Sequence, residues 1–175
     1  MANSLTSKQP PVTTDQVMAL SERLGGLPAA LRDLIAQHNV AVPVHPRWLG
    51  AGADFEIRHF FGRSAEPWQD LAAVNDFYDG RLAPGHLAVA DADGGNLVCM
   101  DRVSGHIFYW DHETHDRGDD PDADEPPLEL ASSLAAFLEA LQPPAPPPAA
   151  TPAPAAGTWK SPDFDTLFKD YKIDE

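Results

Sequence analysis

The chain has 175 residues, enough for one domain with a buried core and an additional segment. Its 12 basic and 27 acidic residues give a formal net charge of −15, which argues against nucleic acid as a partner because phosphates are recognised mainly by Lys and Arg. The single cysteine excludes an internal disulfide, and no apolar run suggests a signal peptide or a membrane span. We therefore expect a cytoplasmic protein without membrane contacts, whose charge favours a basic protein partner.

The first part of the chain predicts two helices. Residues 1–13 are polar and contain prolines, so we expect a flexible N-terminus. Thr14-Asp15 is typical of a helix start, and Gly25-Gly26 is typical of a helix end. Pro28 suits the first turn of a second helix, whose apolar residues at positions 31, 34 and 35 form a stripe facing the core.

The middle of the chain predicts one strand and one helix. Residues 40–52 contain prolines and glycines without periodicity, which indicates an irregular segment with Trp48 in the core. Phe55–Phe60 alternates apolar and polar residues, as a half-buried strand does. Pro67 then begins a third helix over Trp68–Tyr78, with an apolar face formed by Leu71, Val74, Phe77 and Tyr78.

The stretch from His86 to His112 predicts a three-stranded antiparallel meander. Its apolar runs are Leu87–Ala92, Asn96–Asp101 and His106–Trp110. The two turns between them contain Gly94-Gly95 and Gly105, and glycine supplies the positive φ that such turns require. Cys99 lies inside the second run, so we expect a buried, unreactive thiol.

The motifs of this meander are D-x-D-G-G-N at Asp91–Asn96, L-V-C-M-D at Leu97–Asp101 and G-H-I-F-Y-W-D-H at Gly105–His112. Together they resemble the signature of the SUKH superfamily, the Smi/Knr-type proteins. Leu27-Pro28 with a helix ending near Asn39, and the stretch 130–138, are similar to that family's opening and closing elements. The resemblance covers residues 14–142 and implies an α+β fold. In this fold a central, antiparallel-rich sheet that includes the meander is packed by about four helices.

The remaining segments differ in composition. Residues 111–125 hold eight carboxylates and one arginine, a net charge of −7, and should form an exposed loop before a last helix over Ser132–Leu141. Residues 143–158 are rich in Pro and Ala, as extended linkers are. Residues 159–175 predict a short amphipathic helix that could dock on its own domain, on a second copy to give a homodimer, or on a partner. Its candidate docking residues are Trp159, Phe164, Leu167, Phe168 and Tyr171.

No catalytic residue, metal site or cofactor is predicted. His112 and His115 are three residues apart, whereas zinc hydrolases place their histidines four apart on a helix, and Gly118 and Pro121 argue against a helix here. A metal-dependent hydrolase using these two histidines is therefore a minor alternative. The pattern favours a binding protein over an enzyme.

The resemblance implies a bacterial immunity protein that neutralises a cognate toxin domain, often a nuclease, delivered by a type VI or contact-dependent system. An acidic inhibitor suits a basic toxin site because opposite charges speed association. The alternative is an intracellular scaffold or regulatory module that recruits a partner, or a second copy, through the tail helix. For the immunity function the candidate partner-binding residues are Trp110, Asp111, Glu113, Asp116, Asp119, Asp120, Asp122, Asp124 and Glu125.

Overall fold

The computed structural model describes residues 3–116 and 126–146 of the chain. The chain divides into two compact units, Met1–Pro144 and Ala145–Glu175, and every element below belongs to the first. The tail helix predicted over residues 159–175, and most of the predicted linker, lie outside the described residues. Within the described ranges, no helix combines the length and the apolar composition needed to cross a membrane.

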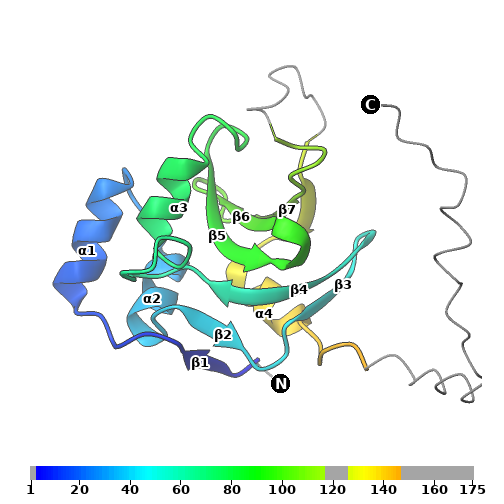
Figure 1. Ribbon diagram of the computed structural model, residues 1–175, viewed down its shortest axis with the longest axis horizontal. Coiled ribbons are helices and arrows are strands. Elements are labelled where there is room, and N and C mark those ends of the chain that lie inside the picture. The colour runs from blue at the N-terminus through cyan, green and yellow to red at the C-terminus, as the bar shows by residue number, and fades with distance from the viewer. Residues whose placement is uncertain (1–2, 117–125, 147–175) are drawn as a thin grey trace, which may run out of the picture. The chain divides into compact units, whose positions relative to one another are not determined.

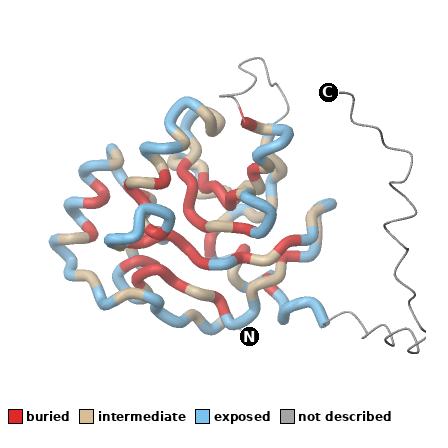
Figure 2. The backbone as a smooth tube through the Cα atoms, viewed as in Figure 1, coloured by how far each residue is buried: buried red, intermediate tan, exposed pale blue. Residues whose placement is uncertain are grey.

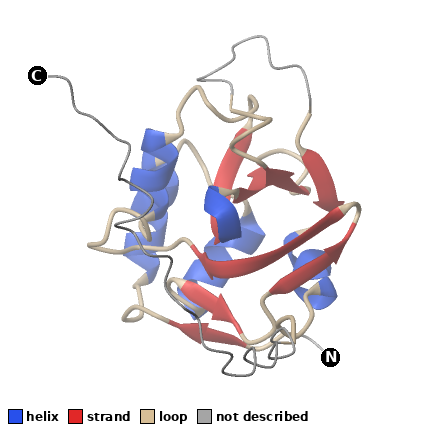
Figure 3. Ribbon diagram, turned by 45° about the vertical axis from the view of Figure 1, so that its right-hand side comes forward, coloured by secondary structure: helices blue, strands red, loops and turns tan. Residues whose placement is uncertain are grey.

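The first unit has an α+β fold, as predicted, in which helices pack around a twisted antiparallel sheet (Figures 1 and 3). Six strands form this sheet in chain order, β3-β4-β5-β6-β7-β8, and β1 and β2 form a separate two-stranded ribbon. The strands are β1 (Leu5–Ser7), β2 (Ala41–Pro43), β3 (Arg47–Gly50), β4 (Ala53–Phe60), β5 (His86–Ala92), β6 (Leu97–Asp101), β7 (Ile107–Trp110) and β8 (Leu128–Ala131). The helices are α1 (Thr14–Arg23), α2 (Ala29–Gln37), α3 (Leu71–Phe77) and α4 (Leu134–Ala140).

Strands β5, β6 and β7 are the predicted meander, and their antiparallel pairing confirms it. Gly94 and Gly105 have φ values of 72° and 75°, so the turn glycines occupy the left-handed region as expected. Cys99 is buried in β6, and burial raises the pKa of its thiol far above the ordinary value. The thiol is therefore held in its unreactive protonated form.

Local capping sets the helix starts. Thr13 begins α1 through a capping box, in which its hydroxyl accepts from the backbone N–H of Gln16 and its own N–H donates to the Gln16 side chain. The third helix begins at Leu71, three residues later than predicted, because the carboxylate of Asp70 caps it by accepting from the N–H of Ala73 at 3.0 Å. Trp68 therefore lies outside the helix.

Four strands were not predicted. Residues 5–7, within the stretch expected to be flexible, form β1 by pairing with β2, and β2 itself lies in the stretch 40–52 predicted to be irregular. Arg47–Gly50 forms β3 in a segment predicted to be irregular, and Leu128–Ala131 forms β8 at the opposite edge of the sheet. All four are short, and each becomes a strand only through pairing with residues distant in the sequence or across a turn.

The core lies between the sheet and the helices, and the central strands are buried along most of their length (Figure 2). Trp48 is buried there, as predicted, and its ring stacks on Phe137 of α4 with 5.2 Å between centroids. Phe60 of β4 meets the same Phe137 ring edge-on. This aromatic contact fixes α4 against the sheet.

Asn39, which follows α2, joins three distant parts of the chain. Its side-chain amide donates to the carbonyls of Pro10 and Arg63 at 2.8 and 3.0 Å, and its oxygen accepts from the N–H of Arg63 at 2.8 Å. Asn39 is buried, so no water can replace these bonds without rearrangement. Gly62 approaches so closely that a Cβ there would lie 2.4 Å from the Asn39 side-chain oxygen.

Both ends of the described domain are held at one segment of the chain. The side chain of Asn3 exchanges two hydrogen bonds with the backbone of His45, at 2.7 and 3.0 Å. At the other end, Arg47 and Gln142 exchange two backbone hydrogen bonds of 3.1 and 2.7 Å. The domain is thus closed before the predicted linker begins.

Candidate functional site

Helix α3 is joined to the sheet by the half-buried side-chain amide of Asn75. The Asn75 side chain donates to the carbonyls of Leu71 and Ala88, at 2.8 and 2.9 Å, and accepts from the N–H of Ala88 at 2.9 Å. These bonds join the helix to strand β5, so the side chains at its end have a defined place. Phe77, the last residue of α3, points away from the core and is 66% exposed.

An apolar groove with a volume of about 440 Å³ lies beside α3. Trp68 contributes to it and is 62% exposed, which is unusual for so large an aromatic ring in a well-packed domain. Sequence analysis missed this groove because it treated Trp68 and Phe77 as part of one helix and expected Phe77 in the core. The lining residues are Phe61, Pro67, Trp68, Ala73, Val74, Phe77, Tyr78, Asp91 and Leu97.

Asp91 is the one charged residue among those that line this groove. It is half-buried, and burial raises the pKa of its carboxyl, while the nearby Arg58 opposes that shift. The nearest cationic atoms are Arg58 Nη1 at 3.6 Å and His59 Nδ1 at 3.9 Å. Both are beyond ordinary hydrogen-bond length, so the ion pairing of Asp91 is loose.

His59, on strand β4, contacts the groove residue Phe61 edge-on, with 5.4 Å between ring centroids. Burial lowers the pKa of its imidazole, an effect that the contact with the Trp68 carbonyl and the charge of Asp91 partly offset. The distance from His59 Nε2 to the Trp68 oxygen is 3.3 Å. This contact helps to hold the segment that carries the exposed Trp68 ring.

Asp116 belongs to the acidic segment, residues 111–125, and is linked to the end of α3 through Arg81. Asp116 is buried, and its two carboxylate oxygens accept from the guanidinium of Arg81, with Nε at 3.1 Å from each. The same guanidinium lies over the rings of Phe77 and Tyr78, 5.1 and 4.8 Å from their centroids. Asp116 is therefore held, through Arg81, close to the exposed Phe77.

A second set of contacts orders the turn just before Asp116. The indole N–H of Trp110 donates to the carbonyl of His115 at 3.0 Å, and the N–H of Asp111 donates to the His115 ring at 2.9 Å. The ring nitrogen and the N–H of His112 contact the Asn96 side-chain oxygen at 2.8 and 3.1 Å. Both histidine rings are thus used within the turn.

In the part of the chain that the structure describes, no group of three or more His, Cys, Asp or Glu side chains converges as metal ligands would. The rings of His112 and His115 hydrogen-bond to Asn96 and to the Asp111 backbone, respectively. The turn contacts give these two histidines a local structural role.

The structure separates the predicted partner-binding residues into three groups. Trp110 and Asp116 are buried, and this corrects the prediction for both, because a core indole and an ion-paired interior carboxylate present no surface to a partner. Glu113 is exposed and Asp111 is half-buried. The other five, Asp119, Asp120, Asp122, Asp124 and Glu125, lie outside the described residues, as do the tail residues Trp159, Phe164, Leu167, Phe168 and Tyr171.

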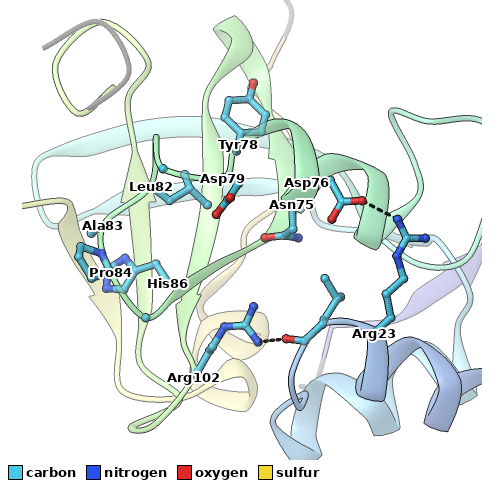
Figure 4. Close-up of a pocket in the computed structure, with 13 residues that line it drawn as sticks. Arg23, Asn75, Asp76, Tyr78, Asp79, Leu82, Ala83, Pro84, His86 and Arg102 are labelled. Atoms are coloured by element: carbon cyan, nitrogen blue, oxygen red, sulfur yellow. Dashed lines mark hydrogen bonds and ion pairs between the residues drawn. The ribbon is translucent and has the colours of Figure 1, made fainter. Parts of the chain in front are cut away.

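A polar pocket of about 720 Å³ also borders α3, on the side facing α1 (Figure 4). Its two arginines already have partners, since Arg23 pairs with Asp76 and Arg102 donates to the carbonyl of Leu24 at 2.7 Å. His86 stacks on Phe108, and burial lowers the pKa of its imidazole. These contacts join α1 and the β6–β7 turn to the sheet, and we assign this pocket a structural role.

A family model for the SMI1/KNR4 family (SUKH-1) matches residues 11–140. The chain belongs to the SMI1/KNR4 family. The match covers the whole described domain except β1 and the last residues, including α3, the groove and the meander.

A curated relative gives limited further information. The chain is 35% identical over 66 residues to the SPbeta prophage-derived uncharacterized protein YokK of Bacillus subtilis (strain 168). The aligned region is 38% of this chain and spans about a third, 34%, of that protein. This likeness is to an uncharacterized protein and indicates no specific activity.

Proposed function

We propose that this SMI1/KNR4-family protein is an immunity protein that binds and neutralises the domain of a cognate secreted toxin. The family is in general one of immunity proteins without enzymatic activity, which supports this class of function. We place its action in the cytoplasm, where a toxin delivered into the cell would meet its target. A nuclease or another toxin with a basic site, delivered by a type VI or contact-dependent system, fits the charge of −15.

The observation that carries the proposal is the position of the exposed aromatic groove beside the start of the acidic segment. Tight protein interfaces combine a few central aromatic anchors with a charged rim. Trp68 and Phe77 supply the anchors, and the exposed Glu113 and half-buried Asp111 supply charge for the rim. The Arg81–Asp116 pair keeps the two parts together.

The two parts have different energetic roles in this proposal. Charges that stay solvated at the rim chiefly accelerate encounter and contribute little to final affinity. Desolvated aromatic side chains slow dissociation, and truncation of one such anchor costs about 2 kcal/mol or more. The acidic segment should therefore set the association rate, and the groove should set the lifetime of the complex.

A rescue experiment tests the function. Cells that express individual toxin domains are screened for survival when the full-length protein is co-expressed, and the binding kinetics of a rescued pair are then measured at several salt concentrations. We expect rescue from one specific toxin. Failure to protect against any toxin in the source organism's own complement would contradict the proposal.

A charge variant tests the role of the acidic segment. Changing Asp119, Asp120, Asp122 and Asp124 to Asn should slow association by about tenfold at low salt and reduce its salt dependence. The matched control removes four charges from exposed helical positions by changing Asp15, Glu22, Asp33 and Glu139 to their amides. An equal effect of both variants would show that only net charge matters.

The tail is tested by a protein that ends at Gln142, which keeps the hydrogen bonds between Gln142 and Arg47. Pull-downs and solution mass are compared for this protein and the full chain. A partner retained by both supports binding through the domain. A partner lost with the tail, or a dimer that becomes a monomer, would move that function to Phe164–Tyr171.

A further inference from the structure

The groove beside α3 combines apolar walls with a single carboxylate. Trp68 and Phe77, which line the groove, are exposed. Asp91, on strand β5, supplies the one carboxylate among the lining residues. A half-buried carboxylate with loose ion pairs has capacity left for further hydrogen bonds, since an ionised carboxylate accepts up to about four. The volume of about 440 Å³ is in the range of about 300–1,000 Å³ found for ligand sites.

The protein contains an internal example of what such an environment binds. Arg81 lies over Phe77 and Tyr78 while its guanidinium forms a two-pronged pair with Asp116. The groove offers the same two aromatic residues, with Trp68 added and with Asp91 in place of Asp116. Arginine suits this combination better than lysine, because its planar group stacks on rings and pairs with a carboxylate through two bonds.

We propose that this groove binds an arginine side chain of the partner protein, with the stem against Trp68 and Phe77 and the guanidinium on Asp91. This inference deepens the proposed function and rests on it for the identity of the partner. It makes the expectation of a basic partner specific: one arginine of that partner contacts the Asp91 carboxylate.

The two basic side chains already near Asp91 do not prevent an arginine from binding to it. Arg58 is exposed along most of its side chain and contacts Asp91 only at 3.6 Å, so it can yield to an incoming guanidinium. His59 is buried, and its lowered pKa keeps the imidazole uncharged at neutral pH, so it does not repel an incoming guanidinium. Asp93 is close enough to influence Asp91 and adds to the negative potential there.

A peptide titration tests the recognition itself without any toxin. The full-length protein is labelled with ¹⁵N and titrated with acetyl-Gly-Arg-Gly-amide, and backbone amide shifts are followed. A second peptide carries citrulline, which has almost the same shape and no charge. We expect saturable shifts around Asp91, Trp68 and Phe77 for the arginine peptide, and binding weaker by about tenfold or more for the citrulline peptide.

Two variants and one control complete the test. Asp91→Asn keeps the shape of the side chain and should weaken arginine-peptide binding by about tenfold, and Trp68→Ala removes an exposed ring and should weaken it severalfold. Asp33→Asn removes one exposed charge from α2 and should leave binding unchanged. Shifts spread over the whole acidic surface, or equal weakening by Asp91→Asn and Asp33→Asn, would overturn the proposal.

The outcome separates this inference from the proposed function. If a toxin is rescued and bound while Asp91→Asn keeps full affinity for it, the immunity function stands and the arginine site is refuted. If the arginine peptide binds at Asp91 and no toxin is rescued, the site stands and the immunity function fails. Loss of toxin affinity in both Asp91→Asn and Trp68→Ala, with the Asp33→Asn variant unaffected, supports both.

Discussion

Removal of the Arg81–Asp116 pair should destabilise the domain strongly, because one partner is inside the protein. The Asp116 side chain is 3% exposed and that of Arg81 is 29% exposed. Breaking a fully buried pair by deleting one partner costs about 3–5 kcal/mol. Since water can reach the Arg81 side, we expect Arg81→Gln to lower the free energy of unfolding by about 2–3 kcal/mol, and the melting temperature by roughly 4–12 °C.

The assay is urea unfolding of both single variants and the double variant, followed by tryptophan fluorescence. Trp110 reports on this region because its ring meets Tyr78 edge-on, 5.3 Å between centroids, and Tyr78 lies under Arg81. Asp116→Asn should cost about 1–3 kcal/mol, since it keeps the shape and removes the charge. The two single changes should not add, and the double variant should recover about 1 kcal/mol or more.

A matched control and a refuting result follow from the same structure. Arg23 forms an ion pair with Asp76 in which both side chains are more than half exposed, so Arg23→Gln should cost about 0–1 kcal/mol. If the Arg81 and Asp116 effects were additive within about 0.5 kcal/mol, the pair would not be coupled, and our account of how the acidic segment is held beside α3 would be wrong.

Three further predictions concern buried groups. Asn39→Ala should lower the free energy of unfolding by about 2–3 kcal/mol in urea titrations, because the backbone groups of Pro10 and Arg63 lose the buried side chain that joins them; a loss below 0.5 kcal/mol would contradict this. The lowered pKa of His59 means that the unfolded chain binds protons more readily below its ordinary pKa of 6.5, so stability should fall as the pH drops from 7 toward the folded-state pKa. His59→Gln should reduce this dependence of stability on pH, and an unchanged dependence would refute the assignment. The raised pKa of Asp91 has the opposite effect, because it increases stability as the pH falls further. Cys99 should react with a thiol reagent only at the rate of global unfolding, and fast labelling of the native protein would contradict its burial in β6.

The elements that could be predicted from the sequence are those specified by neighbouring residues. The meander follows from its glycine turns and apolar runs, and α1 follows from the capping residues and the glycines at its end. Strand β8 could not be predicted in this way, because Leu-Glu-Leu-Ala has no strand preference and extends only by pairing with β7. The same limit applies to β1, which depends on β2 more than thirty residues away.

The candidate site shows why function was harder to predict than fold. The acidic segment can be recognised in the sequence from its many Asp and Glu residues. The groove cannot, because its lining residues lie between Phe61 and Leu97 and come together only in the folded chain. Trp110 was named as a candidate partner-binding residue, yet its side chain is fully buried in the core. Phe77 was expected in the core because of its helical spacing, yet it follows the last turn that packs on the sheet.

The contacts at both ends of the domain have a practical consequence. Asn3 and Gln142 are each bonded to the short stretch His45–Arg47, so the chain enters and leaves the fold at nearly the same place. Joining such ends costs little loop entropy, which makes the domain suitable for insertion into a surface loop of another protein or for circular permutation. The turn at Val103, whose side chain is almost wholly exposed, is the natural position for new termini.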